Sequence, residues 1–205
     1  MSAAPSLMMV TDRLRASGAS LAEDVRSAAA AGLDFVQLRE KDLAAGALLE
    51  LARAVVAAVA GTGTRVLVNG RPDVAVLAGA HGVQLPSEGL PIAAVRRSFP
   101  LLLVGASCHD VAEARAAAAA GASLVLFGPV LPSPGKEARA QGLEALAEVA
   151  RAVEADVYAI GGIDAESAPR ALGAGARGVA AIRPFLREPG AAVRAFRARL
   201  RPRQT

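Results

Sequence analysis

Six basic side chains follow short apolar runs in this chain. Asp12, Glu40 and Glu88 are the acidic residues in the same places, and both lysines of the chain belong to the basic set. Cations in such an arrangement suit an anionic ligand, most simply a phosphate. The six are Arg13, Arg39, Lys41, Arg71, Lys136 and Arg183.

Two glycine-containing segments add to this pattern. Gly161-Gly162 also follows an apolar run, where bare backbone amides could approach an anion closely or where a tight turn simply needs glycine. The stretch 128–136 carries three prolines, the Ser133 hydroxyl and the Lys136 ammonium. It predicts either a clamp over a ligand or an ordinary proline-rich surface loop.

The remaining reactive residue types are few. His109 is either a proton carrier or a cap of the helix expected near Asp110, and Cys108 is expected to be a packed thiol. Gly173–Gly178 fits G-x-G-x-x-G, but it ends a helix and opens a strand, so we do not expect nucleotide binding. No carboxylate pair forms a metal-like arrangement, and Asp12 and Glu88 are the plausible oxygen ligands, so we expect no metal site.

These residues lie between elements that recur along the chain. Short runs rich in β-branched residues and leucine predict eight strands, and the longer segments between them have the three- and four-residue apolar spacing of helices. The predicted strands are 7–10, 35–38, 66–68, 82–85, 101–104, 124–127, 157–160 and 178–182. The clearest helices are 21–31, 44–60, 111–120, 143–153 and 167–172.

An Ala-Gly pair separates helix from strand at 31–32, 78–79, 120–121 and 174–175, as expected where a left-handed residue ends a helix. Strands that alternate with helices pair in parallel, and eight such units predict one (β/α)₈ barrel domain over residues 1–205. An open doubly wound sheet is the alternative. In a barrel the functional groups lie at the carboxyl ends of the strands, which is where the six cations are.

Composition excludes several classes of protein. Apolar residues make up 53% and charged residues 20%, which indicates a globular chain. One cysteine and two histidines exclude a disulfide framework and a histidine-based zinc site. The absence of tryptophan and the scattered arginines argue against nucleic-acid binding, and no apolar stretch predicts a membrane span or signal peptide. We therefore expect a soluble cytoplasmic protein, which could form a homo-oligomer.

Nearly the whole chain resembles the thiamine phosphate synthase/TenI family. The resemblance rests on Val-Thr-Asp-Arg (10–13), Val-Gln-Leu-Arg-Glu-Lys (36–41), Val-Asn-x-Arg (68–71), His-Gly-Val-Gln-Leu (81–85), Gly-x-Ser-x-His (105–109), Phe-Gly-Pro-Val-x-Pro-Ser-x-x-Lys (127–136) and Ala-Ile-Gly-Gly-Ile (159–163). The order and spacing of these motifs make the resemblance specific, and it implies the same barrel fold.

The resemblance also implies site residues. A substrate phosphate is expected on the backbone of Gly161, Gly162, Ile182 and Arg183. Gln37, Arg39, Lys41 and Asn69 match synthase positions around a pyrimidine diphosphate, and Ser133 and Lys136 match the loop over the substrates.

The chain departs from both branches of the family. The synthase joins a hydroxymethylpyrimidine diphosphate to a thiazole phosphate and releases Mg²⁺-bound pyrophosphate, but Gly70 and Gly89 stand where it has two metal-binding aspartates. The TenI tautomerase needs no metal, but Pro129 stands at its catalytic histidine. His109 is then the remaining histidine that could move a proton.

Three functions are compatible with these residues. We expect first a metal-independent, TenI-like tautomerase that binds a thiazole phosphate, with no cofactor. The alternatives are a thiamine phosphate synthase, for which alone Mg²⁺ would be expected, and a non-catalytic binder of thiamine phosphates. Retention of Gln37, Arg39, Lys41 and Lys136 argues against a fully decayed site.

Overall fold

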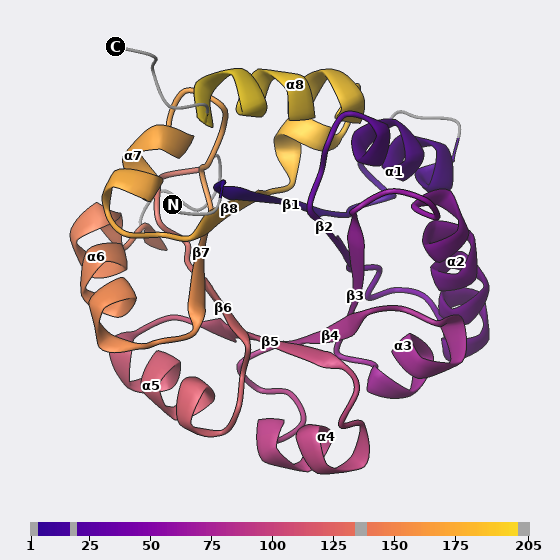
Figure 1. Cartoon of the computed structure of the whole chain (residues 1–205), viewed down its shortest axis with the longest axis horizontal. Helices are drawn as coiled ribbons and strands as arrows, with labels where there is room; N and C mark the ends of the chain where they lie inside the picture. Colours follow the sequence, from indigo (N-terminus) through magenta and orange to yellow (C-terminus); the bar gives the residue numbers. More distant parts are fainter. Residues whose placement is uncertain (1–3, 17–19, 134–138, 201–205) are drawn as a thin grey trace.

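The computed structural model describes residues 4–16, 20–133 and 139–200, and it is a closed parallel barrel. Neighbouring strands pair in sequence order, and β1 also pairs with β8, which closes the ring (Figure 1). The (β/α)₈ prediction is therefore confirmed over the open sheet. The strands are β1 (Ser6–Val10), β2 (Phe35–Leu38), β3 (Arg65–Asn69), β4 (Gly82–Leu85), β5 (Leu103–Cys108), β6 (Leu124–Phe127), β7 (Asp156–Ile160) and β8 (Gly178–Ala181).

Helices surround the ring of strands (Figure 1). The helix after each strand returns the chain to the start of the next strand, as parallel pairing requires. The helices are α1 (Leu21–Ala30), α2 (Ala45–Ala58), α3 (Pro72–Ala78), α4 (Ile92–Ser98), α5 (Val111–Ala119), α6 (Gly142–Ala152), α7 (Ala168–Gly173) and α8 (Pro189–Leu200), with a 3₁₀ turn η2 (Arg183–Phe185) before α8.

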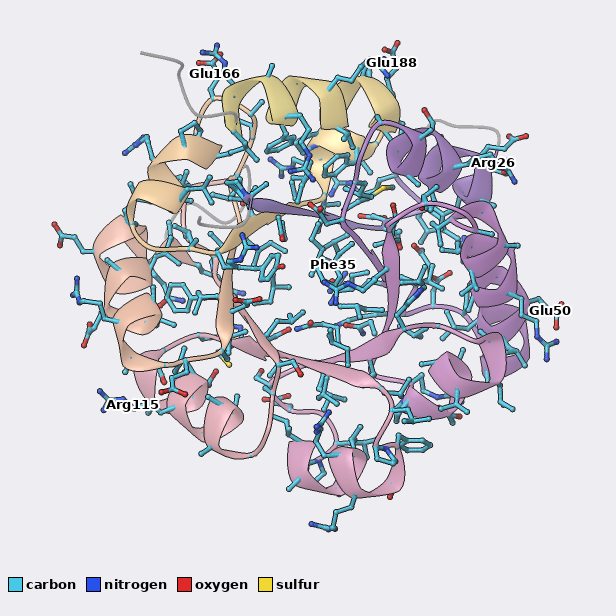
Figure 2. All side chains as sticks on the ribbon, viewed as in Figure 1. Arg26, Phe35, Glu50, Arg115, Glu166 and Glu188 are labelled. Carbon is cyan, nitrogen blue, oxygen red and sulfur yellow. The ribbon has the colours of Figure 1, made fainter. Side chains whose placement is uncertain are left out.

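The core has two parts, one on each face of the sheet. Apolar helix residues such as Leu48, Ala52 and Val55 of α2 are buried against the outer face at helical spacing. Phe35 and Tyr158 meet edge to face inside the ring, with ring centroids 5.8 Å apart. Figure 2 shows Phe35 within the barrel, so the interior below the mouth is filled by side chains and is not a channel.

The predicted glycine stops are confirmed. Gly32, Gly79, Gly121 and Gly175 have φ angles of 93°, 70°, 97° and 97°, the left-handed region in which glycine is favoured. Helix 21–31 is confirmed as α1 to within one residue, and Ser20 caps it by accepting the N–H of Glu23.

The fifth strand was predicted in the wrong place. The prediction 101–104 followed the apolar run, but β5 is Leu103–Cys108, and Leu101 lies in the preceding turn with 96% of its surface exposed. The small residues Gly105, Ala106 and Ser107 continue the strand although they lack the apolar pattern of one. Ser107 and Cys108 are consequently strand residues, not the loop residues that we expected.

Arg197 connects the C-terminal helix to the start of the barrel. Arg197 of α8 pairs with Asp34 and donates hydrogen bonds to the carbonyl oxygens of Gly32 and Pro5, and Asp34 also accepts the N–H of Leu7 at 2.6 Å. These contacts attach α8 to the amino end of the barrel. Within the described ranges, no helix has both the length and the apolar character needed to cross a membrane.

His81 makes the stability of the barrel sensitive to pH. Its Nδ1 accepts the N–H of Val66 at 3.0 Å, which requires that nitrogen to be unprotonated. Desolvation of the ring, aided by the charge of Arg65, lowers the pKa of His81 below its ordinary value of 6.5. The unfolded chain therefore takes up this proton first, and stability is lost as the pH falls through the unfolded pKa towards the lower folded value.

We expect the free energy of unfolding to fall between pH 7.5 and pH 5.5 by a larger amount in the unaltered chain than in His81→Asn. The asparagine Oδ1 can accept the same N–H without titrating. Urea unfolding of both proteins at the two pH values gives the comparison. An equal pH dependence in the two proteins would show that His81 contributes none of it.

Candidate active site at the mouth of the barrel

A cavity of about 900 Å³ opens at the carboxyl ends of the strands. Inward-facing residues at the ends of six strands line it, and loop residues from the same end of the barrel complete the wall. These inward-facing residues are Val10, Gln37, Asn69, Ser107, Leu126 and Ile160, and Ala181 of β8 also lines the cavity. Because all strands are parallel, one rim receives every one of these ends.

Most residues singled out in the sequence line this one cavity. They are Gln37, Arg39, Lys41, Asn69, His109, Ser133, Gly161, Gly162, Ile182 and Arg183. Lys136 lies outside the described residues. Because these residues line one cavity, they lie near one another. The role of each residue stays a prediction.

The set of cations at the mouth differs from the predicted one. Arg13 pairs with Asp42 and lies 3.7 Å from Glu40, and Arg71 forms two hydrogen bonds with Asp73, so neither lines the cavity. Hydrogen bonding by Arg71 lowers the pKa of the Asp73 carboxyl. The prediction that these two guanidinium groups reach the cavity was wrong, and Asp42 and Asp73 bind them outside it.

Arg15 and Arg139 line the cavity and were missed by the sequence reasoning. Arg15 lies five residues beyond the end of β1, and Arg139 lies close to α6, so neither directly follows a strand. Arg15 has an ion-pair partner in Asp12 at 3.5 Å. Across the described ranges, Arg39 and Lys41 have no carboxylate within ion-pairing distance, which leaves them available to an anion.

A buried network positions the loop that carries Arg39 and Lys41. The Thr11 hydroxyl donates to the Glu40 carboxylate and accepts the backbone N–H of Arg39 at 2.9 Å. Glu40 also accepts the backbone N–H of Arg13 at 3.1 Å. Thr11 and Glu40 are buried, so they fix the loops after β1 and β2 to each other from below. The side chains on either side of Glu40 then reach the cavity.

Glycine is required where β7 ends. Gly161 and Gly162 have φ angles of 96° and 66°, and a Cβ on Gly162 would lie 2.5 Å from the carbonyl oxygens of Leu131 and Pro132. The loop after β6 thus packs directly on this turn, and Leu131 donates its N–H to the Gly161 carbonyl at 2.9 Å. The tight-turn interpretation accounts for the glycines, and their exposure to the cavity is what an anion site would also need.

His109 lies at the rim beside Glu113. Its Nδ1 is 3.1 Å from Oε2 of Glu113, and its backbone N–H donates to the same oxygen at 2.8 Å. Asp110, not His109, caps α5 by accepting the N–H of Glu113 at 2.7 Å. The helix-cap alternative therefore belongs to Asp110, and the imidazole of His109, half exposed, faces the cavity.

Cys108 is an unreactive thiol in this environment. Burial, together with the charges of Glu113 and Asp110, raises its pKa to about 12. A thiol with this pKa is protonated at neutral pH and is a poor nucleophile. The prediction of a packed cysteine agrees with its burial.

The residues present do not fit a protein-held Mg²⁺ ion. No group of three or more His, Cys, Asp or Glu side chains converges anywhere in the part of the chain that the structure describes. Asp12 is paired with Arg15, Asp42 with Arg13 and Asp73 with Arg71, and Glu40 is held by Thr11 and Arg13. Asp164, which lines the cavity, accepts the N–H and the hydroxyl of Ser167, and Glu88 has no such partner among the described residues. A single unpaired carboxylate supplies few of the oxygen ligands that Mg²⁺ takes, most of which would have to come from water and substrate phosphates.

The turn after β4 lies beside Gly70 and Gly89, the two positions at which the family resemblance implies metal-binding aspartates. Gly89 donates its N–H to the Pro86 carbonyl at 2.9 Å, and a Cβ on Gly89 would lie 2.9 Å from the Pro86 Cδ. Gly70 has a φ angle of 68°, and its own Cβ would lie 3.9 Å from the same Cδ. Pro86 therefore packs against both positions at which the family resemblance implies metal-binding aspartates.

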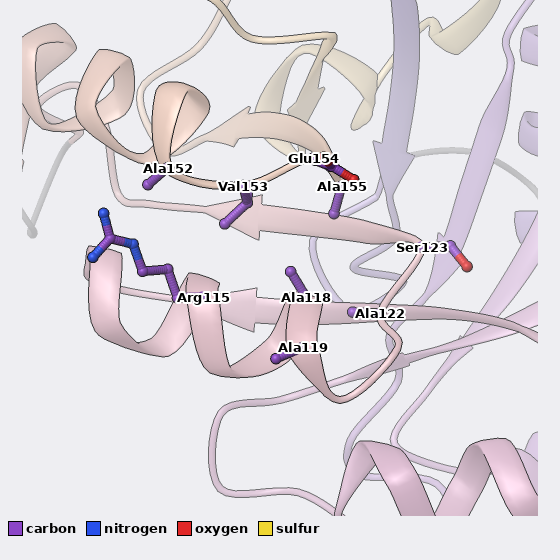
Figure 3. A pocket seen from close by; sticks show the side chains of 9 residues that line it. All are labelled: Arg115, Ala118, Ala119, Ala122, Ser123, Ala152, Val153, Glu154 and Ala155. Carbon is purple, nitrogen blue, oxygen red and sulfur yellow. The ribbon is translucent and has the colours of Figure 1, made fainter.

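A second cavity, of about 520 Å³, lies away from the mouth. Figure 3 shows Arg115 of α5 on one side of it and Ala152–Ala155 on the other. Its walls are mostly alanine, with Arg115 and Glu154 as the charged residues. It lacks the converging polar groups of the mouth, so we place the functional site at the mouth.

We expect Gly162→Ala to lower the affinity for thiazole phosphate by at least about tenfold, because the new Cβ must push the loop after β6 off the turn. Gly173→Ala is the matched control, since nothing lies within 4 Å of a Cβ there. Calorimetric titration of thiazole phosphate into each protein measures the effect. Equal affinity in the two variants would separate this turn from the anion site.

Comparisons with known proteins agree with this geometry. Residues 7–185 match the family model described as thiamine monophosphate synthase. The chain is 45% identical to the "Putative thiamine-phosphate synthase" of Geobacter sulfurreducens, over 90% of this chain and 88% of that protein. It is 44% identical to the thiamine-phosphate synthase of Anaeromyxobacter dehalogenans, over 82% and 77% of the two chains.

A solved structure has the same fold as this chain. The thiamine phosphate pyrophosphorylase of Pyrococcus furiosus superposes with a TM-score of 0.87, at 30% identity and over 95% of each chain. The family model covers most of the chain, and relatives well above 30% identity align over nearly its full length. The chain therefore belongs to the thiamine monophosphate synthase family of thiamine biosynthesis.

Proposed function

We propose that this chain is a thiamine phosphate synthase that joins a hydroxymethylpyrimidine diphosphate to a thiazole phosphate. The observation that carries the proposal is that two groups of residues suited to anions line one cavity. Gly161, Gly162 and Arg183 follow β7 and β8, Arg39 and Lys41 follow β2, and β1 lies between the two groups. Two phosphorylated substrates need two such groups, whereas a tautomerase with one phosphorylated substrate needs one.

The residues have distinct parts in this proposal. The Gly161-Gly162 turn and the Ile182-Arg183 backbone bind the phosphate of the thiazole. Arg39 and Lys41 bind the diphosphate, with Gln37 and Asn69 beside the pyrimidine ring. Ser133 and, by the family resemblance, Lys136 belong to the loop that covers the two substrates.

The bond changes follow from the two substrates. The thiazole nitrogen bonds to the methylene carbon of the pyrimidine, and the bond between that carbon and the diphosphate oxygen breaks. The electron pair leaves with the diphosphate, whose charge is stabilised by Arg39 and Lys41. Because the described carboxylates near the mouth other than Glu88 are held by other protein groups, we assign no step to a metal.

The names of the relatives support this reaction over the tautomerase that we first expected from the sequence. The proteins from Anaeromyxobacter dehalogenans and Methanoculleus marisnigri are named thiamine-phosphate synthase, and this chain covers 77% and 94% of them. The replacement of the two aspartates by Gly70 and Gly89 keeps the tautomerase as a second candidate. The activity assays below distinguish the two.

We expect the purified chain to form thiamine phosphate and an equal amount of pyrophosphate from the two substrates, with Mg²⁺ and also after EDTA treatment. Lys41→Met should raise KM for the pyrimidine diphosphate by about tenfold, the effect of losing one charge-assisted hydrogen bond. Arg53→Met is the matched control, because Arg53 pairs with Glu50 on α2, away from the mouth. Chromatography of the products measures each rate.

The outcomes separate the alternatives. Product that forms only with Mg²⁺ would retain the reaction and refute its metal independence. No product under either condition, with thiazole phosphate still bound, would refute the synthase and leave the tautomerase or the non-catalytic binder.

For the tautomerase candidate, His109→Asn should reduce turnover of a thiazole carboxylate phosphate by roughly 10²–10⁴-fold, the usual contribution of a general acid–base residue. His109 lines the cavity, and an imidazole is the side chain most often used as a general acid or base. Affinity for the same compound is the internal control and should stay unchanged, since in this proposal the phosphate binds at the Gly161-Gly162 turn and not at His109. Unaltered turnover would remove His109 from the chemistry.

A further inference from the structure

A glutamine lies buried inside the barrel, directly below the mouth. Gln84 of β4 has no exposed surface, and its Nε2 donates to the Ser107 hydroxyl oxygen at 3.1 Å. Its Oε1 has no hydrogen-bond partner in the described part of the chain, and among those residues it is the one buried side-chain polar atom left in this state. An unpaired buried acceptor is destabilising, so the amide must have another use.

The neighbouring strand β5 has a glycine where this amide packs against it. Gly105 of β5 faces Gln84, and a Cβ on it would lie 2.1 Å from the Gln84 Oε1. Apolar side chains such as Leu67 and Leu124 fill much of the interior, and Gln37 is the other buried glutamine among the described residues. An aliphatic residue in place of Gln84 would suit such surroundings better.

The hydrogen bond from Gln84 leaves the hydroxyl hydrogen of Ser107 free to point towards the cavity. Ser107 lines the mouth, whereas Gln84 lies below it. A hydroxyl has one hydrogen, and an oxygen that accepts from the amide below is free to donate that hydrogen upwards. No described residue accepts a hydrogen bond from this hydroxyl, so the donor is available to a ligand.

We infer that Gln84 is a positioning residue that holds the Ser107 hydroxyl as a hydrogen-bond donor towards the pyrimidine diphosphate. The identity of this ligand rests on the proposed function. Gln84 of β4 lies in register with Asn69 of β3, and its amide reaches Ser107 of β5, so the pair is next to a residue that the proposal places beside the pyrimidine. Gln84 touches no substrate and acts through Ser107.

The test is Gln84→Met, which keeps an unbranched side chain of similar length and removes the amide. Calorimetry should show a three- to tenfold weaker affinity for the pyrimidine diphosphate, of the order of one neutral hydrogen bond. Affinity for thiazole phosphate should stay unchanged. The melting temperature should stay the same or rise, because the unpaired acceptor is gone.

Ser107→Ala supplies the matched control. It should weaken binding of the same ligand, and the double variant should bind no more weakly than Ser107→Ala alone. Additive losses would overturn the inference, because Gln84 would then act by another route. A lower melting temperature with weaker binding of both ligands would overturn it as well, since that pattern indicates a packing role.

The inference and the proposed function fail in different ways. Thiamine phosphate formation by the unaltered chain together with full affinity in Gln84→Met overturns the inference alone. An unaltered chain that does not bind the pyrimidine diphosphate at all overturns both. Selective loss of affinity without any product in the unaltered chain supports the inference and refutes the synthase reaction.

Discussion

The pairing of β1 with both β2 and β8 is the interaction on which the whole mouth depends. It converts a row of parallel strands into a ring, and a ring brings eight carboxyl ends to one rim. Arg15 and Arg183 line the same cavity for this reason, although most of the chain separates them. Arg197 supports the closure from the opposite end, where it joins α8 to Asp34 and to the carbonyl of Pro5.

Within that ring, pairing among the charged side chains decides which of them can meet a ligand. Glu40 accepts hydrogen bonds from the Thr11 hydroxyl and from the backbone N–H of Arg13. Asp42 and Asp73 form ion pairs with Arg13 and Arg71. Arg39 and Lys41 alternate with Glu40 along the chain, so burying the carboxylate turns the two cations towards the cavity. The mouth is thus positively charged because Glu40 is buried while Arg39 and Lys41 line the cavity.

The sequence predicted the order of elements well because glycine stops and apolar runs are local signals. Gly32 and Gly121 ended helices as expected, and the strand-end rule found most of the cavity lining. It failed for Arg13, because the fold brings Asp42 beside it, and for Arg71, because Asp73 two residues further along binds its guanidinium group. It also misplaced β5, because two residues of that strand are small and lack an apolar pattern. A Cβ on Gly105 would meet the Gln84 amide, and Ser107 accepts a hydrogen bond from it.

The turn after β4 shows why membership of a family does not by itself fix the chemistry of a site. Pro86 packs against the places of both Gly70 and Gly89, so an aspartate at either position would meet the same ring. An aspartate at position 89 would meet it at once, because its Cβ alone comes within 2.9 Å of the Pro86 Cδ. The two glycines and the proline therefore form one structural unit. An aspartate at position 70 would be strained by the left-handed φ of 68°, and one at position 89 would meet the ring and the backbone oxygen of Pro86, each 2.9 Å from its Cβ, so a carboxylate pair could return to this rim only with a change in the backbone of the turn.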